Sequence, residues 1–182
     1  APVHEPVAVP GPAPLAATPI GQRLARPADT PATRRGELFH ACLEVHAPPG
    51  TARDLAALAA QLGLAPELPG IEAAARALIG QAALAPLFDP ARYRRAHNEL
   101  ALVDDEGGLH RVDRVVEHAD AIWLIDYKTG AESLAETDAG LAARHRPQLA
   151  AYHALVAALW PGRPIRTALL LADGRLVDVN SV

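Results

Sequence analysis

Two aspartates and a lysine around an apolar stretch have the residue types needed to hold a metal ion for hydrolytic chemistry. Asp126 and Lys128 come at the end of an apolar stretch that starts at residue 121, and Asp113 lies in the alternating segment before it. Lys128 is two positions beyond Asp126, so both project from the same face of a strand. Carboxylates about 4 Å apart repel by roughly 4 kcal/mol per pair at an effective dielectric near 20. Since one lysine offsets one charge, the rest need protons or a bound cation, and oxygen donors suit Mg²⁺ or Mn²⁺.

The register of two predicted hairpins decides whether these carboxylates meet. A turn centred at Glu106 places Glu99 opposite Asp113, and a second tight turn places Asp113 opposite position 125 or Asp126. Facing side chains in such pairs lie about 4.5–5.5 Å apart between their Cβ atoms. We therefore expect three carboxylates side by side on three adjacent strands. The alternative, a solvated acidic face, is disfavoured because residues 122–125 are apolar and indicate a strand buried on both faces.

The elements that must position these residues are predicted in the order three helices, three strands, one helix and two strands. The predicted helices are residues 33–47, 51–63 and 67–84, then a long helix that has Pro147 near its first turn and stops at Pro161. The predicted strands are residues 93–103, 109–117, 121–127, 165–171 and 175–179. Thr51 and Asp54 resemble a capping box at the start of the second helix. This order predicts an α/β fold, a mixed β-sheet core flanked by helices.

Composition divides the chain into an arm and one domain. Residues 1–33 hold eight of the 17 prolines, which predicts a Pro/Ala-rich arm or linker before a domain at residues 34–182. The 182 residues, 50% apolar and 21% charged, suit one globular domain. The chain contains no methionine, so we expect a fragment of a longer polypeptide.

Several classes of protein are excluded or disfavoured. The single cysteine, Cys42, excludes a disulfide framework and a site built from four thiolates. No apolar run approaches the roughly 20 residues that cross a bilayer, so we expect no membrane partner and a cytoplasmic location. The net charge of −4 means that any contact with DNA must be local or bridged by metal ions. No phosphate-binding loop of a nucleotide-driven motor is present.

Four motifs follow one another between residues 35 and 152. They are Arg35-Gly36-Glu37-Leu38-Phe39-His40, Val112-Asp113-Arg114-Val115-Val116, Ile125-Asp126-Tyr127-Lys128-Thr129-Gly130 and Gln148-Leu149-Ala150-Ala151-Tyr152. Together they resemble the RecB-type nuclease domain of the PD-(D/E)xK nucleases, as at the C-terminus of UvrD-like and AddA-type helicase–nucleases. The resemblance implies a restriction-endonuclease-like sheet flanked by helices.

The resemblance also implies a set of metal ligands. His40, Asp113, Asp126 and the backbone carbonyl of Tyr127 would hold Mg²⁺ or Mn²⁺. Glu99, placed beside Asp113 by the register, stays open between a ligand and a residue that supports the ligands. Some relatives carry an iron–sulfur cluster on four cysteines, and none is expected in a chain with one cysteine.

The remaining motif residues are expected to act on the substrate. Lys128 would orient or deprotonate the attacking water and stabilise the developing oxyanion. Gln148 and Tyr152 lie four apart on one helix face and would contact the DNA phosphate or brace the site. The residues expected to seat DNA phosphates are Arg35, Arg144 and Arg146.

The function implied is a metal-dependent deoxyribonuclease, exonuclease or endonuclease, that hydrolyses phosphodiester bonds in recombinational DNA repair. Its substrate would be single-stranded DNA or duplex ends, supplied by a helicase motor in the same polypeptide or complex. A catalytically inactive DNA-binding or scaffolding module with the same fold is one alternative, disfavoured by the intact His40, Asp113, Asp126 and Lys128. A stand-alone nuclease of the superfamily is another, disfavoured by the proline-rich beginning and the missing methionine.

Overall fold

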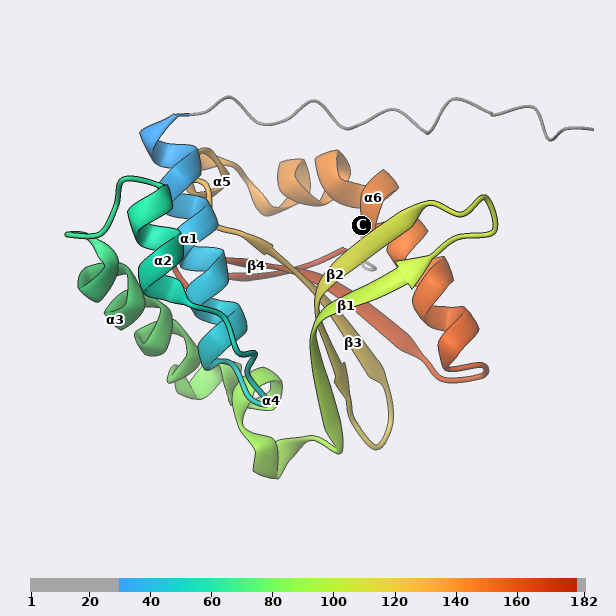
Figure 1. The fold of residues 1–182 in the computed structure, drawn as a ribbon. Coiled ribbons are helices and arrows are strands. Elements are labelled where there is room, and N and C mark those ends of the chain that lie inside the picture. Colours follow the sequence, from blue (N-terminus) through green and yellow to red (C-terminus); the bar gives the residue numbers. More distant parts are fainter. Residues whose placement is uncertain (1–29, 180–182) are drawn as a thin grey trace, which may run out of the picture.

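A five-stranded sheet forms the centre of the computed structural model, which describes residues 30–179. The strands are β1 (Arg95–Val103), β2 (Leu109–Glu117), β3 (Ile122–Lys128), β4 (Ile165–Leu171) and β5 (Leu176–Asp178). They lie in the order β1-β2-β3-β4-β5 (Figure 1), with β3 and β4 parallel and the other neighbours antiparallel. The predicted α/β fold, a mixed sheet flanked by helices, is confirmed.

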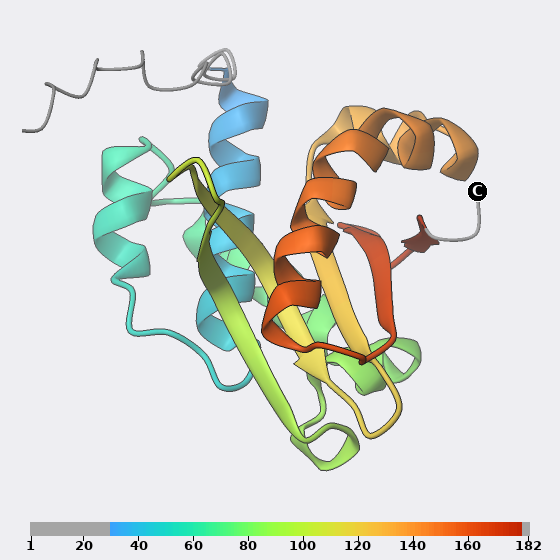
Figure 2. The same ribbon diagram turned by 90° about the vertical axis from the view of Figure 1, so that its right-hand side faces the viewer.

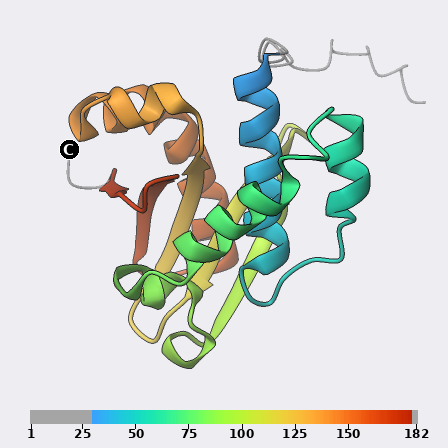
Figure 3. The same ribbon diagram turned by 90° about the vertical axis from the view of Figure 1, so that its left-hand side faces the viewer.

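Helices cover both faces of the sheet. They are α1 (Pro31–His46), α2 (Leu55–Gln61), α3 (Leu68–Ile79), α4 (Ala85–Phe88), α5 (Ala131–Ala135) and α6 (Asp138–Leu159). In Figure 2, α6 lies on one side of the strands and α1 on the other. Figure 3 shows α3 crossing in front of the sheet on the α1 side. The sheet is therefore the middle layer of three.

Each face of the sheet has its own apolar core. Leu124 and Leu169 pack with residues of α6, whereas Ile125 and Leu170 pack with residues of α1, α3 and α4. The neighbouring residues Leu124 and Ile125 are both fully buried, because side chains along a strand point alternately to its two faces. The prediction that the third strand is covered on both faces is confirmed, and its polar end is held in a fixed position.

The first helix starts earlier than predicted. Thr30 caps α1 by accepting a hydrogen bond from the backbone N–H of Thr33, and Pro31 occupies the first turn, where its missing N–H costs nothing. Residues 31–33, assigned above to the arm, therefore belong to this helix. The rest of the predicted arm, residues 1–29, lies outside the described residues.

The starts and ends of the next two helices correct the predictions. Asp54, not Thr51, caps α2 by accepting a hydrogen bond from Ala57 N at 2.9 Å. Thr51 instead donates its hydroxyl to Glu44 of α1 at 2.8 Å. The predicted third helix stops at Gly80, and a 3₁₀ turn followed by α4 takes up residues 82–88.

The prediction for the long helix placed Pro147 too early. The α6 helix begins at Asp138, capped by the Thr137 hydroxyl, so Pro147 lies in its interior. Proline removes one backbone hydrogen bond there and bends the helix, and α6 changes direction along its length in Figure 2. Among the described residues no helix alone is long and apolar enough to span a membrane, although α3 together with residues 82–88 meets those criteria as a pair bent by 63°.

Candidate metal centre

Strand pairing brings three carboxylates to one end of the sheet. In the first hairpin Asn98 pairs with Arg114, so the next residue, Glu99, faces Asp113, as the sequence predicted. In the second hairpin Asp113 lies level with Asp126, one step beyond the last pair of the ladder. Adjacent strands are about 4.8 Å apart, which places the three acidic positions side by side.

Glu99 has an unusual backbone conformation at this point. Its φ is 53°, the left-handed region that a glutamate rarely adopts, and such a residue costs of order 1–3 kcal/mol. Val112 and Val115 belong to the same core although they are three positions apart, a spacing that a regular strand does not allow. Glu99 lies opposite Asp113, between Val112 and Val115, where the β2 side chains stop alternating regularly between the two faces of the sheet. Beyond this point Leu100, Leu102 and Val112 pack in the core that α6 covers.

His40 completes a compact cluster with two of the acids. Its Nε2 atom lies 3.1 Å from Glu99 Oε1 and 3.4 Å from Asp113 Oδ1, and the three donor atoms all lie within 4.8 Å of one another. Burial alone would lower the pKa of His40, but the hydrogen bond to Glu99 and the nearby negative charges raise it overall. Partial burial alone would raise the pKa of Glu99, but the hydrogen bond and charge of His40, followed by those of Arg111, hold this pKa below its ordinary value.

A close approach at Gly36 brings α1 to the end of β3. Thr129, just beyond β3, donates its hydroxyl to the Gly36 carbonyl at 3.2 Å. A Cβ atom at position 36 would lie 3.2 Å from that hydroxyl oxygen, which is tighter than ordinary contact. His40 is one helical turn further along α1. Glycine at position 36 thus allows α1 to approach the end of β3, and this approach fixes the distance between His40 and the sheet.

A buried arginine fixes the other end of α1. Arg114 is fully buried and donates hydrogen bonds to the carbonyls of Leu87 and Pro48 and to Asn98 Oδ1. Asn98 in turn donates to two carbonyls at the C-terminal end of α1. Phe88 lies 4.9 Å from the guanidinium carbon, ring centre to atom. The network ties the helix that carries His40 to the strands that carry the acids.

Asp113 replaces part of the strand ladder with its side chain. Its Oδ2 accepts a hydrogen bond from the backbone N–H of Tyr127 at 2.6 Å, where the β2–β3 backbone pairing has ended. Burial raises the pKa of Asp113 to about 7, an effect that the charge of His40 opposes and that of Asp126 reinforces. A bound cation would remove this penalty on the ionised carboxyl.

Asp126 and Lys128 adjoin the cluster as an ion pair. Lys128 Nζ lies 2.6 Å from Asp126 Oδ2, and both project from the same face of β3, as predicted. This is the face that α6 covers, since Ile122 and Leu124 at the same alternation pack with α6. Lys128 is the partner of the buried Oδ2 oxygen, so a cation at Asp126 would compete with the lysine for Oδ2 or bind the other carboxylate oxygen.

The negative charge of Asp126 acts on both His40 and Asp113. Among the described residues, however, no trio of donors that includes Asp126 falls within 4.8 Å. The compact trio contains Glu99 instead.

The two polar residues of α6 lie as the sequence predicted. Gln148 Nε2 donates to Tyr152 Oη at 3.0 Å across one turn of the helix. Burial raises the pKa of Tyr152; the bond from Gln148 opposes this, and the charges of Asp126 and Asp113 add to it. Tyr152 packs against the core on the α6-covered face of the sheet, the face from which Asp126 projects.

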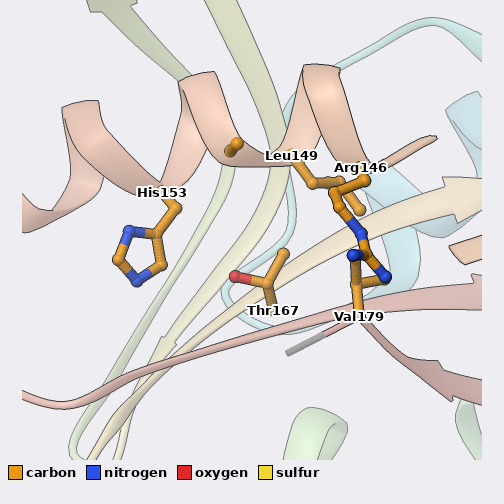
Figure 4. Close-up of a pocket in the computed structure, with 6 residues that line it drawn as sticks. Arg146, Leu149, His153, Thr167 and Val179 are labelled. Atoms are coloured by element: carbon orange, nitrogen blue, oxygen red, sulfur yellow. The ribbon is translucent and has the colours of Figure 1, made fainter. Parts of the chain in front are cut away.

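The three arginines expected to bind DNA have different surroundings. Arg35 forms an ion pair with Glu67, and Arg144 forms one with Glu136. Arg146 lines a separate cavity beside α6 (Figure 4). None of the three contacts the carboxylate cluster through a described interaction.

Two more residues lie near the cluster: Arg111, which was not singled out from the sequence, and His145, which lies between the two α6 arginines expected to seat DNA phosphates. Arg111 Nη1 lies 3.3 Å from Glu99 Oε2. Arg111 is two residues before Asp113, and residues two apart on a strand point to the same face, so this spacing could have indicated its position. The pKa of His145 is lowered by burial and then by the positive charges of Lys128 and Arg144. Its position three residues before Gln148 puts it on the same helix face.

The donor set fits a hard divalent cation. Carboxylate oxygens are the ligands that Mg²⁺ prefers, and Mn²⁺ also accepts an imidazole nitrogen. Glu99, Asp113 and His40 supply such donors in one place, and the Asp126 carboxylate, paired with Lys128, lies beside them. A cavity of about 610 Å³, bounded by the first half of α1 and by Thr129, reaches His40 and gives access from solvent.

Comparison with known proteins gives one family. Residues 20–179 match the family model of the PD-(D/E)XK nuclease superfamily. No curated protein matches the chain.

Proposed function

We propose that this chain, which belongs to the PD-(D/E)XK nuclease superfamily, is a divalent-metal-dependent nuclease domain that hydrolyses phosphodiester bonds of DNA. The observation that carries the proposal is the convergence of His40, Glu99 and Asp113 within 4.8 Å. The ion pair of Asp126 and Lys128 stands beside this cluster. Three strands thus contribute carboxylates and an ammonium group, and α1 contributes an imidazole, to one small region of the molecule.

The chain's own residues divide the work of hydrolysis. His40, Glu99, Asp113 and Asp126, with the Tyr127 carbonyl, would hold the cation. When bound, that cation supplies Lewis acidity and neutralises charge at the scissile phosphate. The ammonium group of Lys128, 2.6 Å from Asp126, would orient the attacking water and stabilise the negative charge that develops on the phosphate oxygens.

Residues of α6 and the protein surface would position the strand. The hydroxyl of Tyr152, already bonded to Gln148, can donate a hydrogen bond to a phosphate oxygen. Arg35 and Arg144 are partly exposed in their ion pairs, and exposed ion pairs contribute little to stability. DNA phosphates would therefore compete readily with the carboxylates for these two guanidinium groups.

A finer assignment is part of the proposal. The order of the four motifs supports a RecB-type domain that acts on single-stranded DNA or duplex ends. A helicase motor in the same polypeptide or complex would supply the strand during recombinational repair in the cytoplasm. The 610 Å³ cavity beside His40 would be the approach of the strand to the cluster.

The experiment is a cleavage assay with end-labelled single-stranded and duplex DNA. We expect cleavage with Mg²⁺ or Mn²⁺, its loss with EDTA, and a loss of at least about 100-fold in Asp126→Asn. Asp120→Asn, in the exposed turn between β2 and β3, is the matched control and keeps full activity. DNA binding without cleavage by folded protein would contradict the proposal and favour an inactive module.

A further inference from the structure

A second cavity lies beside α6, toward the β4 and β5 strands. It has a volume of about 210 Å³, and Figure 4 shows the side chains that line it. Its residues are Arg146, Leu149, Ala150, His153, Thr167 and Val179. Leu149, Thr167 and Val179 are buried and form the floor, whereas Arg146 and Ala150 are exposed at the rim. The cavity is thus a shallow surface pocket with a largely apolar floor and polar side chains around it.

This cavity and the proposed metal centre use different sides of the same helix. Residues 146, 149, 150 and 153 recur at helical spacing and face the cavity. Gln148 and Tyr152, two and six positions after Arg146, lie about 200° and 240° around the helix from it at 100° per residue, outside the face that lines the cavity. The cavity is therefore outside the site already described.

A buried hydroxyl without a partner marks the cavity as a binding site. Thr167 is only 3% exposed, and its Oγ1 atom makes no hydrogen bond with the described residues. In Figure 4 this oxygen points into the space between α6 and β4. Leaving a buried hydroxyl unsatisfied costs about 1–3 kcal/mol, a penalty that a polar ligand would remove.

The other polar groups around Thr167 favour an anion. Arg146 presents hydrogen-bond donors only and forms no ion pair with the described residues. His153 lies on the other side of Thr167 in Figure 4. No lining residue is acidic. Asp178, the nearest acid on β5, is exposed while Val177 and Val179 on either side are buried, so it points away.

We propose that this cavity binds a phosphate group. A tetrahedral oxyanion offers oxygens to Arg146, Thr167 and His153 at once, and the guanidinium fork is suited to phosphate. The same chemistry is available from free phosphate or from a phosphate in a DNA backbone. Phosphate binding here does not depend on the proposed nuclease function, whereas DNA as its source does.

Titration of inorganic phosphate into the full chain tests the site. The buffer contains EDTA and no phosphate, and binding is followed by calorimetry and by ³¹P NMR. We expect Arg146→Met to weaken binding by about tenfold or more and Thr167→Val by about fivefold. Arg166→Met is the control and binds like the wild type, because this exposed arginine adjoins Thr167 on β4 but lies over Trp123 on the other face of the sheet. Equal phosphate affinity in the wild type and both cavity variants would overturn the proposal.

Thermal unfolding supplies a second readout, because the Tm of one cavity variant is expected to rise, whereas most substitutions of buried residues lower it. Valine has the shape of threonine without its hydroxyl, so Thr167→Val should raise the Tm in phosphate-free buffer by removing an unsatisfied group. Phosphate should then raise the Tm of the wild type more than that of the variant. A lower Tm for Thr167→Val without phosphate would show that the hydroxyl already has a partner and would contradict the proposal.

Two further arms locate the site and its ligand. Asp113→Asn should bind phosphate as the wild type does, since the cavity is separate from the carboxylate cluster; loss of binding there would refute a separate site. Displacement of bound phosphate by a single-stranded oligonucleotide would support a DNA phosphate as the occupant. Retention would support free phosphate.

Discussion

His40 of α1 and Asp113 of β2 meet at 3.4 Å between Nε2 and Oδ1, although the helix and the strand are far apart in the sequence. Two attachments make this meeting possible. Gly36 brings the first half of α1 against Thr129 at the end of β3, and Asn98 holds the end of the helix through its last carbonyls. The helix is therefore fixed on both sides of the imidazole.

Gly36→Ala tests the first attachment. The added methyl must move Thr129 or α1 by a few tenths of an ångström, so we expect Mn²⁺ affinity to fall several-fold. Adding Thr129→Ala should restore much of that affinity, because the crowded oxygen is removed. Gly70→Ala in α3 meets open space and should instead raise stability by roughly 0.5–1 kcal/mol. Unchanged Mn²⁺ affinity in Gly36→Ala would argue against this role.

Arg114→Met tests the second attachment. The change leaves the carbonyls of Leu87 and Pro48 and the Asn98 side chain without their donor, and each unsatisfied buried group costs about 1–3 kcal/mol. We expect the free energy of unfolding in urea to fall by about 3 kcal/mol or more. Arg166→Met, which removes an arginine stacked on Trp123, should cost less than about 1 kcal/mol. Similar losses for the two variants would contradict the network.

Lys128→Met separates catalysis from cation binding. Lys128 is the ammonium partner of Asp126, so its removal should leave Mn²⁺ affinity equal to that of the wild type or higher. DNA cleavage should fall by about 100-fold or more, since a group that stabilises developing charge is lost. Parallel calorimetry and cleavage assays give both numbers. Full cleavage activity in this variant would remove Lys128 from the proposed chemistry.

Cation binding should depend on pH through Asp113. Its pKa is raised to about 7, so below that pH the carboxyl is protonated and a cation must displace the proton. The raised pKa of His40 acts in the same direction. We therefore expect Mn²⁺ affinity to fall as the pH drops from 8 to 6, and calorimetry at pH 6 in buffers of different ionisation enthalpy to show proton release. Binding at pH 6 without proton release would contradict this assignment.

The sequence predicts the sheet well because strand alternation and turn positions carry its register. Glu99 opposite Asp113, and Lys128 on the same face as Asp126, follow from counting residues across the turns. The helix boundaries were less predictable. Asp54 and Thr51 are both good caps, and the choice between them depends on the bond from Thr51 to Glu44, a contact with another helix.

Two features of the site could not be predicted from the sequence. The left-handed backbone of Glu99 has no local signal, because glutamate disfavours that conformation and tertiary contacts impose it. Arg114 looks like a surface residue by type, and only the fold shows that neutral oxygens surround it. The expected ligands were His40, Asp113, Asp126 and the Tyr127 carbonyl, with Glu99 left open, and in the structure the imidazole of His40 lies nearest to Glu99 and Asp113.

The most direct test of the metal centre is pulsed electron paramagnetic resonance of Mn²⁺ bound to the chain. We predict one bound Mn²⁺ whose spectrum shows coupling to an imidazole nitrogen, with the coupling lost in His40→Gln while the carboxylates still hold the ion. His153→Gln, on the far side of α6 from the cluster, should leave the coupling intact. Bound Mn²⁺ without nitrogen coupling in the wild type, or coupling that survives in His40→Gln, would contradict the convergence of His40, Glu99 and Asp113 on one cation.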